Sequence, residues 1–190
     1  MNRMMITLLL VLFGASISHS QQAVVYVDQT YGDDLLGDGK KPTNDASGLG
    51  PIKTIYRALY VVADNGTIVL LAGEYSEGSW RGGDIVIDSV TAPHVKSRLT
   101  LKAQRQGNNQ CIDITAGSLI IDIDNLELNV ETANGTEYFS LAGRLVLGNK
   151  DHSVKMIIPE SSYFRLRSRE SLVLNGKSAF LKAEPETGKR

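Results

Sequence analysis

The stretch SLIIDIDNLELNV at residues 118–130 alternates aliphatic side chains with acidic or amide ones. A period of two is typical of a β-strand that buries one face and exposes the other. The opening of this stretch returns as RLVLG at residues 144–148 and as SLVLN at residues 171–175. The chain therefore contains a weak internal repeat whose unit is a short strand.

The repeat places leucine at equivalent positions 26 and 27 residues apart, and a related RLTLK segment lies 20 residues before the first of them. Repeats of this length, built from several short strands, suit one coil of a parallel β-helix. We therefore predict an all-β fold, a right-handed parallel β-helix whose coils stack about 4.8 Å apart with aliphatic side chains inward. An antiparallel sandwich with chance similarity between its strands is the alternative. The aligned leucines are Leu99, Leu119, Leu145 and Leu172.

A single helical pattern precedes these strands, in GPIKTIYRALYVVADNG at residues 50–66. Pro51 suits the first helical position, and the pair Asn65-Gly66 suits the end of the helix. We expect this helix to cover the first coil, whose apolar interior and strand edges are otherwise exposed. Because no second helix is indicated, the sequence disfavours a doubly wound α/β fold, whose crossovers need helices. The apolar residues at helical spacing are Ile52, Ile55, Leu59 and Val62.

The first twenty residues combine Arg3, a short apolar run and small residues, which is the layout of a secretory signal peptide. A retained N-terminal anchor is the alternative, but the run is too short to span a bilayer. We divide the chain into a signal peptide (1–20), a strand, loop and helix region (21–64), and β-helix coils (65–190), which stop without an evident cap. More chain, another molecule or the last residues themselves would have to cover that edge. The location expected is extracellular or at the cell surface, with the periplasm as another possibility.

The Gly-rich segment at residues 28–50, between the first strand and the helix, contains five aspartates, four of them within its first eleven residues. Several carboxylates in a short loop can supply oxygen ligands to Ca²⁺, although their spacing differs from the EF-hand pattern. The alternative is a set of turns in which aspartate accepts hydrogen bonds from backbone amides. We therefore predict that the protein requires no cofactor and that Ca²⁺ is a candidate ligand. The candidate ligands are Asp28, Asp33, Asp34 and Asp38.

The segment SYFRLRSRES near the C-terminus places one tyrosine and three arginines on one face of a strand. Arginine binds carboxylates through two hydrogen bonds, so such a row suits an acidic sugar polymer. The alternative is a charged strand face that discourages edge-to-edge pairing. The residues of this candidate binding site are Tyr163, Arg165, Arg167 and Arg169.

No complete catalytic set is visible. Asp122 and Asp124 are two residues apart on a strand, a spacing that suits the paired carboxylates of glycoside hydrolysis. The alternative is that they simply occupy the solvent-exposed face of the strand, as carboxylates commonly do. Neither His94 nor His152 has the spacing of a metal pair or a triad. The single cysteine, Cys111, allows no internal disulfide, and we expect it to be a small buried side chain. The net charge of −1 excludes a strongly basic nucleic-acid binder.

The region from Val24 to Glu77 resembles the opening of secreted parallel β-helix proteins of the pectate-lyase-like group. The resemblance rests on VVYVD, GDD, GDGKKPTND, GPIKTIYRAL and ADNGTIVLLAGEYSE. It implies a capping helix and a first coil, but no particular chemistry, because that group includes lyases, hydrolases, isomerases and non-catalytic surface proteins. Together with the row of arginines, this resemblance leads us to expect a protein that binds polysaccharide, either as part of a lyase or hydrolase or without catalysis. The rival function is a structural or adhesive surface solenoid.

Overall fold

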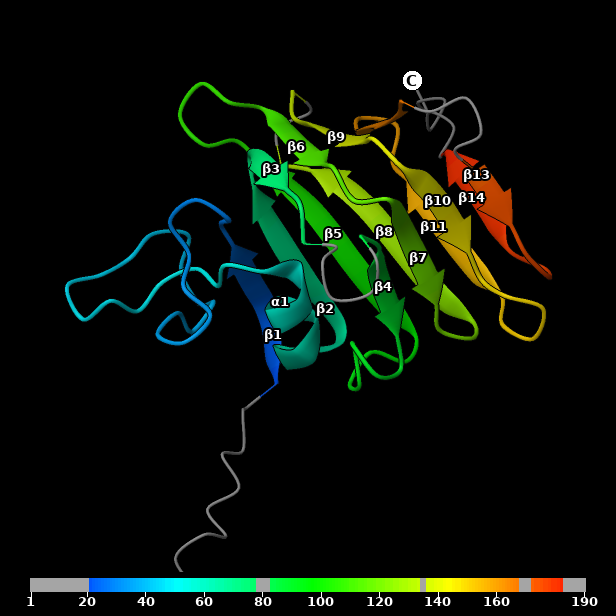
Figure 1. The fold of residues 1–190 in the computed structure, drawn as a ribbon, viewed down its shortest axis with the longest axis horizontal. Coiled ribbons are helices and arrows are strands. Elements are labelled where there is room, and N and C mark those ends of the chain that lie inside the picture. The colour runs from blue at the N-terminus through cyan, green and yellow to red at the C-terminus, as the bar shows by residue number, and fades with distance from the viewer. Residues whose placement is uncertain (1–20, 78–82, 134–135, 168–171, 183–190) are drawn as a thin grey trace, which may run out of the picture.

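The chain folds into a parallel β-solenoid of about three turns, with one short helix near its start (Figure 1). This computed structural model describes residues 21–77, 83–133, 136–167 and 172–182. The predicted fold class is therefore confirmed. The expected signal peptide, residues 1–20, lies outside the described residues.

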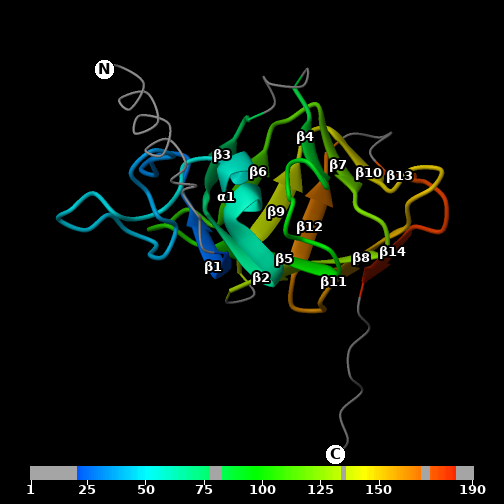
Figure 2. The ribbon, with the colours of Figure 1, turned by 90° about the horizontal axis from the view of Figure 1, so that it is seen from below.

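Three parallel sheets form the walls of the solenoid, and Figure 2 shows them from a second direction. The first sheet has the strand order β1-β2-β5-β8-β11-β14, with bounds Gln22–Val27, Val62–Leu71, Arg98–Gln104, Leu126–Thr132, Val154–Ile158 and Ala179–Lys182. The second has the order β13-β10-β7-β4, with bounds Leu172–Leu174, Arg144–Leu147, Ser118–Asp122 and Ile85–Asp88. The third has the order β12-β9-β6-β3, with bounds Tyr163–Leu166, Tyr138–Leu141, Cys111–Ile114 and Gly73–Tyr75.

The repeated leucines stack in register, as the sequence predicts. Leu145 pairs with Leu119 on one side and with Leu172 on the other. Leu99 does not belong to this column, so that part of the alignment is wrong. It lies in β5 and pairs with Leu128, while Ile85 takes the place beneath Leu119. The error arises because β5 and β7 are different sides of one coil, and both bury aliphatic side chains.

The core is one continuous cluster of inward-facing side chains that runs the length of the stack. In the third sheet Ile112, Phe139 and Phe164 form an inner column, and the two phenylalanine rings stack with centroids 6.2 Å apart. With no internal disulfide available to Cys111, burial of these columns supplies most of the favourable free energy of folding.

The helix α1 is shorter than predicted and spans Ile55–Val61. Pro51 precedes it in an extended segment, where Ile52 bridges to Val27 of β1. Thr54 is the N-cap, and its side chain accepts a hydrogen bond from the Arg57 amide. The predicted start and end are therefore both wrong. The Ile52 bridge extends the backbone before the helix, and pairing of Val62 with Gln22 of β1 extends it directly afterwards.

The predicted role of the helix, which is to cover the first coil, agrees with its packing. Ile55, Ala58 and Leu59 are buried in the core cluster. The Tyr56 hydroxyl donates a hydrogen bond to the Asp84 carbonyl and accepts one from the Val86 amide, so it satisfies backbone groups at the β4 edge. The helix and the loop of residues 28–50 lie at the same end of the stack (Figure 1).

At the opposite end the inward positions are incompletely covered. Leu172 and Leu174 are 40% and 47% exposed, whereas Leu145 and Leu147 one coil earlier are fully buried. Among the described residues, no helix has the length and hydropathy that crossing a bilayer requires.

Candidate functional site: the outer face of the third sheet

The outer face of the third sheet gathers tyrosines, carboxylates and arginines from four strands. We call it the Tyr–Arg face. Strand alternation turns Tyr163 and Arg165 outward, whereas Phe164 and Leu166 pack against the core. The predicted division of this strand into an outward and an inward face is thus confirmed for Tyr163–Leu166. The predicted binding role stays a prediction, and Arg169 lies outside the described residues. The Tyr–Arg face comprises Glu74, Cys111, Asp113, Tyr138, Ser140, Tyr163, Arg165 and Arg167.

Parallel register builds the first column of this face. Tyr163 pairs with Tyr138, which pairs with Cys111. The two tyrosines are 57% and 38% exposed, so adjacent coils present two aromatic side chains to solvent. Tyr138 was not predicted from the sequence, because its neighbour Tyr163 is 25 residues away and only the strand register brings the two together.

A second column carries the charges. Arg165 pairs with Ser140, then Asp113, then Glu74, in successive coils. Arg167 reaches back across the face and forms an ion pair with Asp113. Among the described residues, no carboxylate forms an ion pair with Arg165, whereas Arg167 is paired with Asp113. The face is therefore cationic at β12 and acidic at β3 and β6.

Cys111 is half-buried on this outer face, so the expectation of a buried side chain is wrong. The neighbouring Ile112 takes the inward position, and Cys111 turns outward by strand alternation. Partial burial raises the pKa of the Cys111 thiol, although its hydrogen bond with Tyr138 opposes the shift. The thiol is therefore uncharged at neutral pH, which does not suit a nucleophile.

The four aspartates predicted as candidate calcium ligands mainly hold backbone turns. Asp28 accepts hydrogen bonds from the Thr30 and Tyr31 amides, and its other oxygen accepts one from the Gln106 side chain. Asp33 accepts hydrogen bonds from the amides two and three residues later, and these bonds lower its pKa. Asp38 accepts a hydrogen bond from the Lys40 amide.

Asp34 differs, because it bonds the Lys53 and Thr54 amides and the Thr54 hydroxyl across 19 and 20 residues. It therefore fastens the loop to the start of α1. In the described part of the chain, no three His, Cys, Asp or Glu side chains gather as a metal site. Calcium binding by the loop stays a prediction.

A histidine–aspartate pair lies at a corner of the second sheet. His152 Nδ1 is 2.8 Å from Asp122 Oδ1, and the Asn149 side chain donates to the same oxygen at 2.7 Å. This contact raises the pKa of His152. Asp124 is engaged separately with the Ser153 amide, so the two carboxylates have different partners. The pair was not predicted from the sequence, although its 30-residue separation is only slightly longer than the repeat of 26 and 27 residues.

The chain was compared with protein-family models, with curated proteins and with solved structures, and none of the three comparisons finds a match. The fold is thus a parallel β-solenoid without a family assignment. The functional conclusion has to rest on the geometry of the faces described above.

Proposed function

We propose that this protein binds a carboxylate-bearing polysaccharide along the Tyr–Arg face. The observation that carries the proposal is the register of that face, in which Tyr138 and Tyr163 lie beside Arg165, a cation without an ionic partner among the described residues. Sugar rings present apolar faces that pack on aromatic side chains, and Arg binds carboxylates bidentately.

The shape of the site favours a polymer over a compact ligand. The parallel strands repeat about every 4.8 Å, so equivalent side chains recur along the stack in a straight column. Glu74 and Asp113 continue the second column toward the helix end, where their oxygens can accept hydrogen bonds from neutral sugar hydroxyls. Uronate groups of the polymer would then lie near β12 and its neutral groups nearer β3.

Binding without catalysis is the form of this function that we propose. Asp122 and His152, a pair able to transfer protons, lie at a corner of the second sheet, away from the Tyr–Arg face. The signal-like residues 1–20 support an extracellular location, where such polymers occur. The resemblance of residues 24–77 to the pectate-lyase-like group is consistent with this proposal.

The test compares retention of the mature protein on immobilised polygalacturonate with retention on neutral dextran. Arg165→Ala should weaken polygalacturonate binding by about tenfold or more, as a charge-assisted pair is worth about 1.5–3 kcal/mol. Lys155→Ala, which removes the same charge from β11 of the first sheet, is the matched control. Equal losses for both variants, or unchanged retention of Arg165→Ala, would contradict the proposal.

A structural or adhesive solenoid is the second candidate, and the exposure of Leu172 and Leu174 at inward positions favours it. Such a surface suits end-to-end assembly through unpaired strand edges. Light scattering of the mature protein distinguishes the two functions. Concentration-dependent assembly without retention on polygalacturonate would support the structural or adhesive function. A monomer that binds polygalacturonate would support polysaccharide binding.

A further inference from the structure

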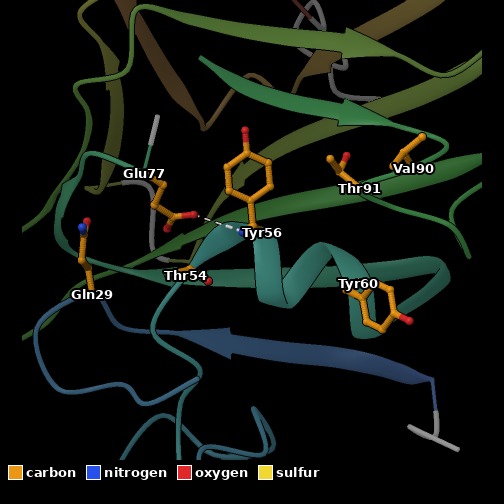
Figure 3. A pocket seen from close by; sticks show the side chains of 7 residues that line it. All are labelled: Gln29, Thr54, Tyr56, Tyr60, Glu77, Val90 and Thr91. Atoms are coloured by element: carbon orange, nitrogen blue, oxygen red, sulfur yellow. Dashed lines mark hydrogen bonds between the residues drawn. The ribbon is translucent and has the colours of Figure 1, made fainter. Parts of the chain in front are cut away.

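A pocket of about 580 Å³ lies along α1, and none of its lining residues belongs to the Tyr–Arg face. Its volume lies in the range of sites that hold small organic molecules. Figure 3 shows its lining coming from the start of the 28–50 loop, from α1, from the residues after β3 and from the turn after β4. The lining residues are Gln29, Thr54, Tyr56, Tyr60, Glu77, Val90 and Thr91.

One part of the pocket is apolar. The Tyr56 ring stands between Glu77 on one side and Val90 and Thr91 on the other (Figure 3). Its orientation is fixed, since its hydroxyl bonds both the Asp84 carbonyl and the Val86 amide. Val90 is 65% exposed at the rim, so this part is open to solvent.

The hydroxyl donors near these walls are already engaged within the protein. Thr54 Oγ1 donates to Asp34 at 2.7 Å, and Thr91 Oγ1 donates to the Val86 carbonyl at 2.7 Å. The Tyr56 hydroxyl donates to the Asp84 carbonyl at 2.8 Å. Tyr60 points its hydroxyl away from the Glu77 end (Figure 3). A ligand at that end therefore finds few donors to bind.

Among the residues that the structure describes, two acceptors remain at the Glu77 end. Gln29 Oε1 is buried and has no hydrogen-bond partner within the described part of the chain. Glu77 accepts the Ile55 amide at one oxygen and the Tyr56 amide at the other, at 2.5 and 3.1 Å. Each carboxylate oxygen can accept one bond more. The polar groups left for a ligand are thus acceptors, and one of them is a carboxyl group that is negatively charged when it is ionised.

We propose that this pocket binds a small organic ammonium ion, with its N–H donors on Glu77 and Gln29 and its apolar body against Tyr56 and Val90. An ammonium group supplies three donors and no acceptor, which matches the two acceptors at that end. Carboxylate and phosphate ligands are disfavoured, because they would lie against Glu77 and near Asp34, whose charge acts on Glu77.

The experiment uses phenethylammonium as the probe, with phenethyl alcohol and phenylacetate as neutral and anionic compounds of similar shape. Binding to the mature protein is measured by ligand-observed NMR and isothermal calorimetry. The amine should bind at least tenfold more tightly than the alcohol, and phenylacetate should not bind. Equal binding of amine and alcohol, or no binding of the amine at millimolar concentration, would overturn the proposal.

Two variants locate the site. Val90→Trp fills the exposed rim and should reduce amine affinity at least tenfold with little change in the melting temperature. Val24→Trp, an exposed valine on β1 outside the pocket, is the matched control and should bind as the wild type does. Gln29→Leu removes the unpartnered acceptor and should also weaken the amine. Unchanged affinity of Val90→Trp would place the binding elsewhere and overturn the assignment.

A pH series adds a readout that simple hydrophobic binding would not show. Burial, with Asp34 close by, raises the pKa of Glu77 to about 7, although the Ile55 and Tyr56 amides oppose the shift. An alkylammonium remains protonated until about pH 10. Amine affinity should therefore rise as the pH increases through 7 and Glu77 ionises, while alcohol affinity stays constant. A flat amine profile would contradict the role of Glu77.

Discussion

The leucine column allows a graded test of the stack, because the same substitution can be made at equivalent positions of successive coils. Leu145 is fully buried between Leu119 and Leu172, whereas Leu172 is 40% exposed at the end of the column. Leu145→Ala and Leu172→Ala delete the same atoms. The difference between their effects reports how well the next coil covers each position.

The expected magnitudes follow from burial. Deleting three buried carbons costs about 2.4 kcal/mol in transfer free energy, and the cavity raises the loss at Leu145 to about 3–4 kcal/mol. At Leu172 only the covered 60% of the side chain counts, and water can fill the space, so the loss is about 1.4 kcal/mol. The free energies of unfolding of the two variants should therefore differ by about 2 kcal/mol.

Urea unfolding followed by circular dichroism measures both losses. With a slope of about 2 kcal/mol per M, the midpoint should fall by about 1.7 M for Leu145→Ala and by about 0.7 M for Leu172→Ala. The slope itself should not change. Equal losses at the two positions would mean that Leu172 is covered in solution, and a negligible loss at Leu145 would refute its place in the core.

Three further predictions concern titratable groups. Because the pKa of Glu77 is raised to about 7, the native state binds the proton more tightly than the unfolded state, so stability should fall by up to about 3 kcal/mol as the pH rises from 5 to 8. Urea midpoints across that range should show a flatter profile for Glu77→Gln, and an unchanged profile would refute the assignment. NMR titration should give His152 a pKa above its usual value that decreases in Asp122→Asn; no decrease would argue against the observed contact. Asp64 accepts hydrogen bonds from the Lys96 and Ser97 amides, so Asp64→Ala should lower the unfolding free energy by about 1–3 kcal/mol, and a melting temperature equal to that of the wild type would count against this.

The solenoid could be predicted from the sequence because its core positions repeat a chemical type at a near-constant interval. The column of Leu119, Leu145 and Leu172 follows from that repeat alone. The assignment of Leu99 to the same column failed, since the pattern within one strand does not reveal which side of the coil the strand forms. Only pairing with Leu128 decides that.

The helix shows the limit of local pattern in another way. Helical spacing predicted a longer helix, but Asp34 and Glu77, from distant segments, bind the amides of residues 53–56 and fix where it begins. Such long-range capping leaves no periodic signal in the helix itself. The sequence therefore indicates that a helix exists but not its bounds.

One part of the Tyr–Arg face could be predicted from the sequence, and the other part could not. Alternation within β12 predicts that Tyr163 and Arg165 share a face, and this is what the structure shows. Their neighbours Tyr138 and Asp113 come from other coils, so only strand register could bring them to the same face. His152 and Asp122 meet for the same reason, across about one coil.

Every face described above depends on one claim, that successive coils pair in parallel and in register. Nuclear Overhauser contacts between backbone protons measure this pairing directly. The solenoid predicts contacts from β10 to β7 and to β13, linking Leu145 with Leu119 and Leu172, with all three strands in the same direction. Antiparallel contacts between strands that follow each other in sequence, such as β6 with β7, would contradict the fold and both proposed binding sites.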